Sequence, residues 1–311
     1  MVLARKKTKK ESPKTVSYKQ PLAVGYHKKK SFLLYRNLTN KGQSLCITPA
    51  SKDGSFGTKS SAVSIVDEKK KKEDIVRCKD FRFGGDDKKL VMTYVRETES
   101  GLSLVYATTT DKKKWKVEHV ISKIKTAGIV RQIISKNKTK KKTVPHIYFG
   151  DHVVRVAKSD NKKWDVVEPP RVPYWHFFEG VPFNVVGGVL TDEGYVLFYA
   201  AEHVVDIMKD VNLSDQKIGE ERLLKIGLAL FSENDPTRLL WQTELPIVEV
   251  PLETYGNISV LGVLPVVDKK ITHYQLYIGS QEGEIGYVEI PHDIITHHKQ
   301  VQPVQLKKWK D

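Results

Sequence analysis

The sequence predicts an all-β fold made of one repeated unit, and three observations support this prediction. First, a tyrosine inside a short apolar run recurs five times, at intervals of roughly 50 to 80 residues. Second, four of these runs are followed by a further run and then by a turn that contains an aspartate. Third, short segments bounded by turn signals fill the chain, and helical periodicity is nearly absent. The five tyrosines are Tyr35, Tyr94, Tyr148, Tyr199 and Tyr277.

Each repeat has room for about four short strands, and four-stranded units arranged around an axis make a β-propeller, whose closed ring protects the sheet edges. We therefore expect a single five-bladed β-propeller over residues 18–293. A basic N-terminal segment, residues 1–17, and a basic C-terminal tail, residues 294–311, flank it. The expected blades span about 18–58, 60–118, 119–166, 167–245 and 246–293.

The predicted strands follow in order along the chain. The first blade contains strands near Pro21–Tyr26, Ser31–Tyr35 and Ser44–Pro49, followed by an Asp-Gly turn. The second opens with SAVSIV and continues through VRCKDFRF, and the third begins with GIVRQIIS. In the fourth, an insertion over 204–225 ends in GEERLLK, for which a short helix is expected. The fifth contains ISVLGVLPVV, HYQLYIGS and EIGYVEI.

The net charge of +15 is concentrated at the two ends of the chain. Residues 1–30 hold ten Lys and Arg against one acid, and residues 299–311 hold four Lys against one. Elsewhere, lysines cluster at 69–72, 112–114 and 138–142, where turns are predicted, so we expect them to be solvated. Because no aromatic residues are interleaved with them, nucleic acid is not an expected partner, and only binding through the basic tails stays open.

Other features bear on the compartment. No run of eighteen apolar residues is present, and the N-terminus lacks the apolar segment of a signal peptide. Cys46 and Cys78 are the only cysteines, and neither has the spacing of a metal site. We therefore expect a cytoplasmic protein without a metal, an organic cofactor or a membrane partner, and leave a homo-oligomer open.

Charged residues occur in the strands that are expected to line the axis. In a propeller the first strand of each blade is innermost, and binding sites gather there. Charges on such strands are costly unless they are paired or functional, although an exposed edge pair is the alternative for Asp80 and Arg82. The polar residues predicted at or beside the axis are Lys79, Asp80, Arg82, Arg131, Glu179 and Asn257.

Two carboxylates on either side of a glycosidic bond can cleave it, one as acid and the other as base or nucleophile. Asp80 of the second blade and Glu179 or Glu202 of the fourth would face each other across the axis. An aromatic group over 174–178 suits stacking on sugar rings, or packing. The sequence thus favours chemistry on carbohydrates.

Several motifs, taken in order, strengthen this hypothesis. They are LLYR at 33–36, KDFRF at 79–83, DEGYVLFYAAEH at 192–203 and KIGLALFSENDPTRLLWQTELPIVE at 225–249. Together they resemble glycoside hydrolase family 130, the five-bladed mannoside phosphorylases and related mannosidases. The resemblance runs from about Tyr18 to Pro291 and is most specific over Leu228–Glu249.

The resemblance implies roles for individual residues. In the family motif Glu-Asp-Pro-Arg the Asp donates a proton, and the matching residues here include Asp80 as the acid and Arg82 as a ligand of substrate or phosphate. Lys79 replaces the acid of that motif. Arg36 follows the first repeated tyrosine as it does in the family, which implies that it binds substrate or phosphate.

Further positions match the family less closely. The Tyr-His-Gly of the family becomes Tyr199-Ala200-Ala201, which keeps the tyrosine as a candidate substrate ligand but removes a histidine associated with phosphate. Glu282 loosely matches an Asp late in the fifth blade. Arg131 is a further candidate for binding phosphate.

The leading hypothesis is therefore a glycoside phosphorylase or hydrolase that acts on β-linked mannosides or similar short glycans with inversion. Asp80 would protonate the leaving oxygen, while phosphate held by arginines, or water activated by Glu179 or Glu202, attacks the anomeric carbon. Inorganic phosphate is then a co-substrate. The alternative is a catalytically inactive propeller that binds a glycan or a protein. Lys79 favours this alternative, because a neighbouring cation favours the charged carboxylate over the acid.

Overall fold

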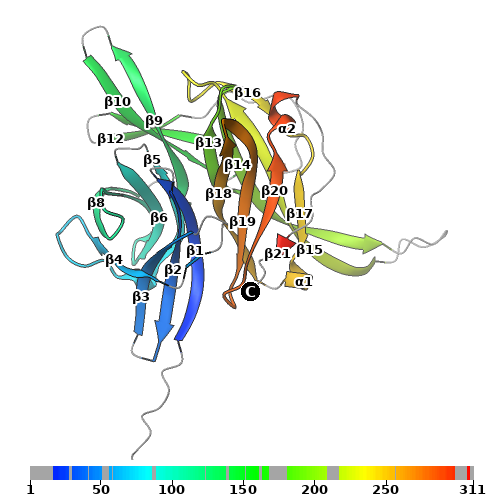
Figure 1. Cartoon of the computed structure of the whole chain (residues 1–311), viewed down its shortest axis with the longest axis horizontal. Coiled ribbons are helices and arrows are strands. Elements are labelled where there is room, and N and C mark those ends of the chain that lie inside the picture. Colours follow the sequence, from blue (N-terminus) through cyan, green and yellow to red (C-terminus); the bar gives the residue numbers. More distant parts are fainter. Residues whose placement is uncertain are drawn as a thin grey trace, which may run out of the picture.

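A computed structural model shows that the chain is built almost entirely of β-strands (Figure 1). It describes residues 17–27, 30–40, 42–50, 56–57, 59–85, 89–122, 124–137, 140–150, 152–160, 163–167, 181–208, 217–255, 257–297 and 307–308. Among these residues, no helix is long and apolar enough to cross a membrane.

The first two antiparallel meanders share one sheet. The first consists of β1 (Ser17–His27), β2 (Lys30–Thr39), β3 (Gly42–Pro49) and β4 (Ser61–Val66). The second follows a 3-10 helix (Ile75–Arg77) and consists of β5 (Cys78–Gly85), β6 (Leu90–Thr98), β7 (Gly101–Thr109) and β8 (Lys114–Ile121). Strand β4 pairs antiparallel with β3 and parallel with β8. The segment SAVSIV, expected to open the second blade, therefore joins both units.

Three further meanders complete the fold. The third consists of β9 (Gly128–Asn137), β10 (Lys140–Phe149), β11 (Arg155–Asp160) and β12 (Lys163–Val167). The fourth consists of β13 (Asn184–Leu190), β14 (Tyr195–Met208), β15 (Lys217–Phe231), β16 (Leu239–Gln242) and β17 (Val248–Pro251), and helix α1 (Leu252–Tyr255) follows it. The fifth consists of β18 (Ile258–Asp268), β19 (Lys270–Ser280), β20 (Ile285–Pro291) and β21 (Lys307–Lys308), with helix α2 (Asp293–Thr296) after β20.

The five repeated tyrosines occupy equivalent places in the meanders. Each lies on the second strand of its unit, namely β2, β6, β10, β14 or β19, and each is buried. A buried tyrosine removes a large aromatic surface from water. Their recurrence therefore marks one core position that every unit uses.

The aspartate turns owe their conformation to local hydrogen bonds. The Oδ1 of Asp111 accepts hydrogen bonds from the backbone N–H of Lys113 and Lys114, at 2.9 and 2.8 Å. Trp115 donates from Nε1 to the carbonyl of Lys112 at 3.0 Å, and its ring is almost fully buried. In the fourth meander, Asp235 caps its turn in the same way by accepting from the N–H of Thr237. The side chain thus replaces the backbone partners that a tight turn lacks.

The first strands of the five meanders contact one another in a closed cycle around an axis. Strand β1 contacts β5, which contacts β9, and the cycle continues through β13 and β18 back to β1. In Figure 1, β1, β13 and β18 lie near the middle of the molecule, and β9 extends from there into the hairpin at the upper left. Glycines allow the close approach: a β-carbon on Gly84 would lie 2.6 Å from the carbonyl oxygen of Val130, and Gly262 has a φ of +142°.

The insertion of the fourth unit is a long hairpin and contains no helix. Strands β14 and β15 pair over their whole length, with Val204 opposite Arg222. In Figure 1 this hairpin projects to the right of the body. The helix expected over 219–225 is therefore wrong, because cross-strand hydrogen bonding overrides the helix propensity of Glu, Arg and Leu.

Candidate active site

Asp80 lies in a β-bulge near the start of β5. The register shifts between Lys79 and Arg82, so Asp80 and Phe81 together oppose Tyr94 of β6. Asp80 has a φ of 52°, in the left-handed region that aspartate tolerates better than most residues. Phe81 is fully buried and stacks on Tyr94 with 5.3 Å between ring centroids, whereas Asp80 is exposed. The bulge thus turns the carboxylate out of the core while the next residue anchors the strand.

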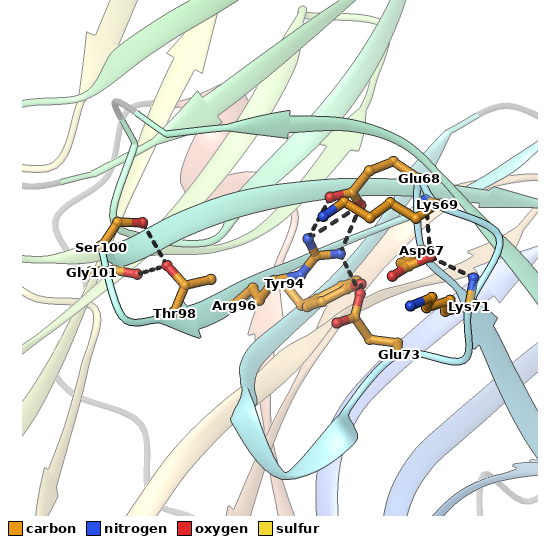
Figure 2. A network of polar contacts seen from close by, with 10 residues as sticks. All are labelled: Asp67, Glu68, Lys69, Lys71, Glu73, Tyr94, Arg96, Thr98, Ser100 and Gly101. Carbon is orange, nitrogen blue, oxygen red and sulfur yellow. Dashed lines mark hydrogen bonds and ion pairs between the residues drawn. The ribbon is translucent and has the colours of Figure 1, made fainter.

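A network of polar contacts holds the segment that leads into β5 (Figure 2). Glu73 is buried and accepts hydrogen bonds from Tyr94, at 2.8 Å from the hydroxyl, and from the guanidinium of Arg96. Arg96 also donates to both oxygens of Glu68, at 3.1 and 3.2 Å. Burial and then the neighbouring Glu73 carboxylate raise the pKa of Tyr94, so its hydroxyl stays protonated and donates. Tyr94 and Arg96 of β6 therefore hold the chain at Glu73, seven residues before Asp80.

Arg36 holds the same segment from the first meander. Its Nη2 donates to the carbonyls of Ile75, at 3.2 Å, and Cys78, at 2.7 Å. Partial burial lowers the pKa of Arg36. The thiol of Cys78 donates to the carbonyl of Asp74 at 3.3 Å. Arg36 of β2, predicted to bind substrate or phosphate, therefore bonds to main-chain oxygens at and before Cys78, which is two residues before Asp80.

Arg82 crosses the axis from the second meander to the fourth. Its Nε donates to the carbonyl of Val185 on β13, at 3.3 Å, and its Nη1 to the carbonyl of Phe81, at 2.8 Å. The residue is only 8% exposed. Burial lowers the pKa of Arg82, and the nearby Asp80 carboxylate offsets only part of this decrease. Arg82 thus connects the first strands of two meanders.

Arg131 makes a second bridge between meanders. From β9 it donates to the carbonyls of Ser232, at 2.9 Å, and Glu233, and to the hydroxyl of Tyr148 at 3.2 Å. Its guanidinium lies 4.8 Å from the ring centroid of Tyr195. Arg131 is 5% exposed, so its charge is held among carbonyls and aromatic faces.

A cavity of about 720 Å³ occupies the axis. Residues from β1, β5, β9, β13 and β18 line it, including Arg82 and Arg131. On β1, β5 and β13 the lining residues lie toward the C-terminal end of the strand, as in 24–27, 82–84 and 186–190. Asp80, near the start of β5, is not among them. Asp80 lies two residues before Arg82, the first lining residue of β5, and its carboxylate acts on the charge of Arg82.

The other predicted site residues are spread over the molecule. Tyr199 is buried against Phe183, with ring centroids 5.4 Å apart. Glu202 lies on the β14–β15 hairpin, half-exposed, and accepts a hydrogen bond from Arg222 at 2.7 Å. Glu282 is exposed in the turn after β19. The pKa of Tyr18 on β1 is raised, first by burial of the tyrosine and then by the negative charge of Glu282.

The remaining predicted site residues are Glu179, the aromatic group at 174–178 and Asn257. Glu179 and the aromatic group at 174–178 lie outside the described residues. Asn257 is exposed just before β18, where its carbonyl accepts from the N–H of Gln281 at 3.1 Å. Among the described residues, no three His, Cys, Asp or Glu side chains are grouped in a way that could hold a metal ion.

Solved structures share this architecture over nearly the whole chain. A glycoside hydrolase of the GH130 family of mannoside phosphorylases, which targets β-1,2-mannosidic linkages in Candida mannan, matches with a TM-score of 0.59 at 17% identity, over 93% of this chain and 87% of its own. The β-1,2-mannobiose phosphorylase of Listeria innocua matches with a TM-score of 0.59 at 13% identity, over 93% and 94%. The chain has the GH130 fold. A glycosyl hydrolase from Bacteroides ovatus matches with a TM-score of 0.55 at 16% identity, over 93% and 87%.

The likeness confirms, at the level of the fold, the resemblance to glycoside hydrolase family 130 found in the sequence. No protein-family model and no curated protein sequence matches the chain. The likeness to these enzymes is therefore one of fold, at 13–17% sequence identity.

Sequence reasoning missed the network around Glu73. Tyr94 was a marker of the repeat, and its hydroxyl bond to an acid on a distant loop leaves no local pattern. The sequence offers one sign of this residue, an acid that directly follows the lysine run 69–72. Arg96 lies two residues after Tyr94, so both side chains emerge from the same face of β6.

Proposed function

We propose that this chain is a carbohydrate-active enzyme that cleaves β-linked mannosides or similar short glycans with inversion, and that Asp80 is its general acid. The observation that carries the proposal is the bulge at Asp80, which presents an exposed carboxylate at the start of an inner strand of a GH130 fold. Non-glycine residues with left-handed φ gather at functional sites, where the surrounding structure holds them in place.

The proposed architecture is a five-bladed propeller in which each meander is one blade. The closed cycle of contacts among β1, β5, β9, β13 and β18 supports it. Each of these strands begins its meander, so it would be the innermost strand of its blade. The parallel pairing of β4 with β8 would then join the outer strands of the first two blades.

The proposed reaction uses the Asp80 carboxyl as a proton donor. Its proton passes to the glycosidic oxygen as the bond from that oxygen to the anomeric carbon breaks. In phosphorolysis, an oxygen of inorganic phosphate forms the new bond from the opposite face, and the products are a sugar 1-phosphate and a shortened glycan. In hydrolysis, water attacks and loses its proton to a carboxylate, for which Glu179 and Glu202 are the candidates.

Cations near Asp80 would bind phosphate or substrate in this scheme. Arg82 lies two residues after Asp80 on β5, and Arg36, on β2, bonds to the carbonyl of Cys78, two residues before Asp80. Main-chain partners hold both arginines in fixed positions. Arg131, on β9, bonds instead to the carbonyls of Ser232 and Glu233. A role in phosphate binding therefore fits Arg36 and Arg82 better than Arg131.

The test is an assay of the purified full-length chain with β-1,2-mannobiose, with and without inorganic phosphate. Mannose 1-phosphate formed only with phosphate identifies a phosphorylase, and mannose formed in both conditions identifies a hydrolase. Asp80→Asn keeps the size of the side chain but donates no proton, so we expect turnover to fall by about 10²–10⁴-fold. Asp268→Asn, at an exposed position at the end of β18, is the matched control.

An unchanged rate in Asp80→Asn would refute its role as the acid. If no glycan turns over but β-1,2-mannobiose binds and protects the protein from unfolding, the inactive glycan-binding alternative replaces the enzyme. Lys79, beside the proposed acid, is the feature that favours that alternative.

A further inference from the structure

The repeated tyrosine lies beside a bulge of the first strand in the first, second, fourth and fifth meanders. In each of these, the pairing between the first and second strands shifts next to the tyrosine, which is Tyr35, Tyr94, Tyr199 or Tyr277. A bulge changes the direction of the side chains on its strand, and bulges are frequent beside active sites. The residues at the four shifts are Leu22, Asp80 with Phe81, Val186 and Leu261. Among these bulges, that of β5 is the one that presents a carboxylate.

The backbone of Asp80 needs support from its surroundings. Its φ of 52° is one that a side chain other than glycine rarely adopts, so packing must hold it. Phe81 supplies this support: it is fully buried and stacks on the ring of Tyr94, with centroids 5.3 Å apart and planes 24° apart. The place of the Tyr94 ring therefore determines where the bulge and its carboxylate lie.

The hydroxyl of Tyr94 is held by an acid in the segment between β4 and β5 (Figure 2). It donates to Oε2 of Glu73 at 2.8 Å, and the same buried oxygen accepts from Arg96. At the equivalent position on β19, the hydroxyl of Tyr277 donates to Gln275 of its own strand, also at 2.8 Å. A hydrogen bond to a carboxylate is the stronger of the two kinds. Tyr94 is thus fixed at both ends, by a ring contact and by a charged acceptor.

We propose that Tyr94 is a positioning residue, whose bond to Glu73 keeps its ring against Phe81 and so directs Asp80 toward the glycosidic oxygen. This inference rests on the proposed function, in which Asp80 is the general acid, and adds to it the device that places the acid. Tyr94 is fully buried, so it acts through the bulge and not on the substrate. A displaced acid transfers its proton less well even when the substrate binds as before.

Tyr94→Phe tests the proposal, because it keeps the ring and removes the bond. Two quantities are measured on the full-length protein: turnover of β-1,2-mannobiose with phosphate present, and amide hydrogen exchange of the native state. We expect kcat to fall about tenfold with KM changed less than about twofold, and faster exchange confined to residues 78–82. Tyr277→Phe is the matched control, since it removes a hydroxyl bond from an equivalent buried tyrosine, and we expect neither change.

Variants of Glu73 separate positioning from general stability. Glutamine still offers one oxygen to both donors, so Glu73→Gln should keep kcat within about twofold of the parent value although it removes the charge. Glu73→Met removes the acceptor and should reproduce the effect of Tyr94→Phe on kcat and on exchange. It also takes the place of Tyr94→Phe if that variant does not fold.

The outcomes distinguish this inference from the proposed function. If the parent chain turns over the glycan, unchanged kcat or unchanged exchange at 78–82 in Tyr94→Phe overturns the positioning role and leaves the proposed function in place. Equal losses of kcat in Glu73→Gln and Glu73→Met overturn it as well. If the parent chain turns over no glycan, the proposed function fails, and the exchange at 78–82 alone decides whether Tyr94 holds the bulge.

Discussion

Replacement of Glu73 by glutamine tests whether the network before β5 stabilises the protein. The Glu73 side chain is 7% exposed, and a glutamine there would keep its volume and an oxygen for the Tyr94 hydroxyl. What is lost is the negative charge opposite Arg96, whose side chain is 11% exposed. Removing one partner of a buried ion pair costs about 3–5 kcal/mol. Because Glu68 still pairs with Arg96, we expect a loss at or just below the lower end of this range, about 2–3 kcal/mol.

The measurement is the free energy of unfolding in urea, followed by tryptophan fluorescence. Glu68→Gln is the matched control: Glu68 bonds the same arginine, but its side chain is 45% exposed, so we expect a loss of only about 0.2–1 kcal/mol. Equal m-values for the variants and the parent protein make the comparison valid. A loss in Glu73→Gln no larger than that in Glu68→Gln would refute the reasoning.

Three further predictions concern the core. Burial raises the pKa of Tyr148 and of the Cys78 thiol to about 12, so between about pH 10 and 12 the unfolded chain binds fewer protons than the folded one. The free energy of unfolding should therefore fall with rising pH, by about 1.4 kcal/mol per pH unit for each such group, and a flat profile from pH 9 to 11 contradicts this. For the same reason, an aromatic disulfide reagent at pH 8 should label Cys78 only after unfolding; labelling of Cys78 in native protein counts against its burial. Gly84→Ala should cost about 2 kcal/mol or more in urea unfolding, because its β-carbon meets the Val130 carbonyl, whereas Gly57→Ala, with no neighbour closer than 3.6 Å, should be nearly neutral.

The sequence predicted the repeat well because its signals are local. The tyrosine inside each second strand and the aspartate turn after Thr109 depend on residues only a few positions apart. The resemblance to glycoside hydrolase family 130 gave the same fold as the solved structures. The helix expected at 219–225 failed because pairing with β14 is not visible in that segment alone.

The site was less predictable because its contacts join distant parts of the chain. Arg82 was expected at the axis, but its bond to Val185 connects residues 103 positions apart. Arg36 was expected to bind substrate or phosphate, and its bonds to the carbonyls of Ile75 and Cys78 span about forty residues. The partners of both arginines are main-chain carbonyl oxygens, which every amino acid supplies, so the identity of the partner residue predicts nothing.

The pairing between β4 and β8 determines which parts of the molecule unfold together. The N–H of Ser64 bonds to the carbonyl of Lys113 at 2.8 Å, so backbone hydrogen bonds connect the first two meanders directly. Within the described residues, the other neighbouring meanders belong to separate hydrogen-bonded sheets. The strands of residues 17–121 should therefore exchange their core amide protons as one cooperative unit, which native-state hydrogen exchange would show as a common opening free energy.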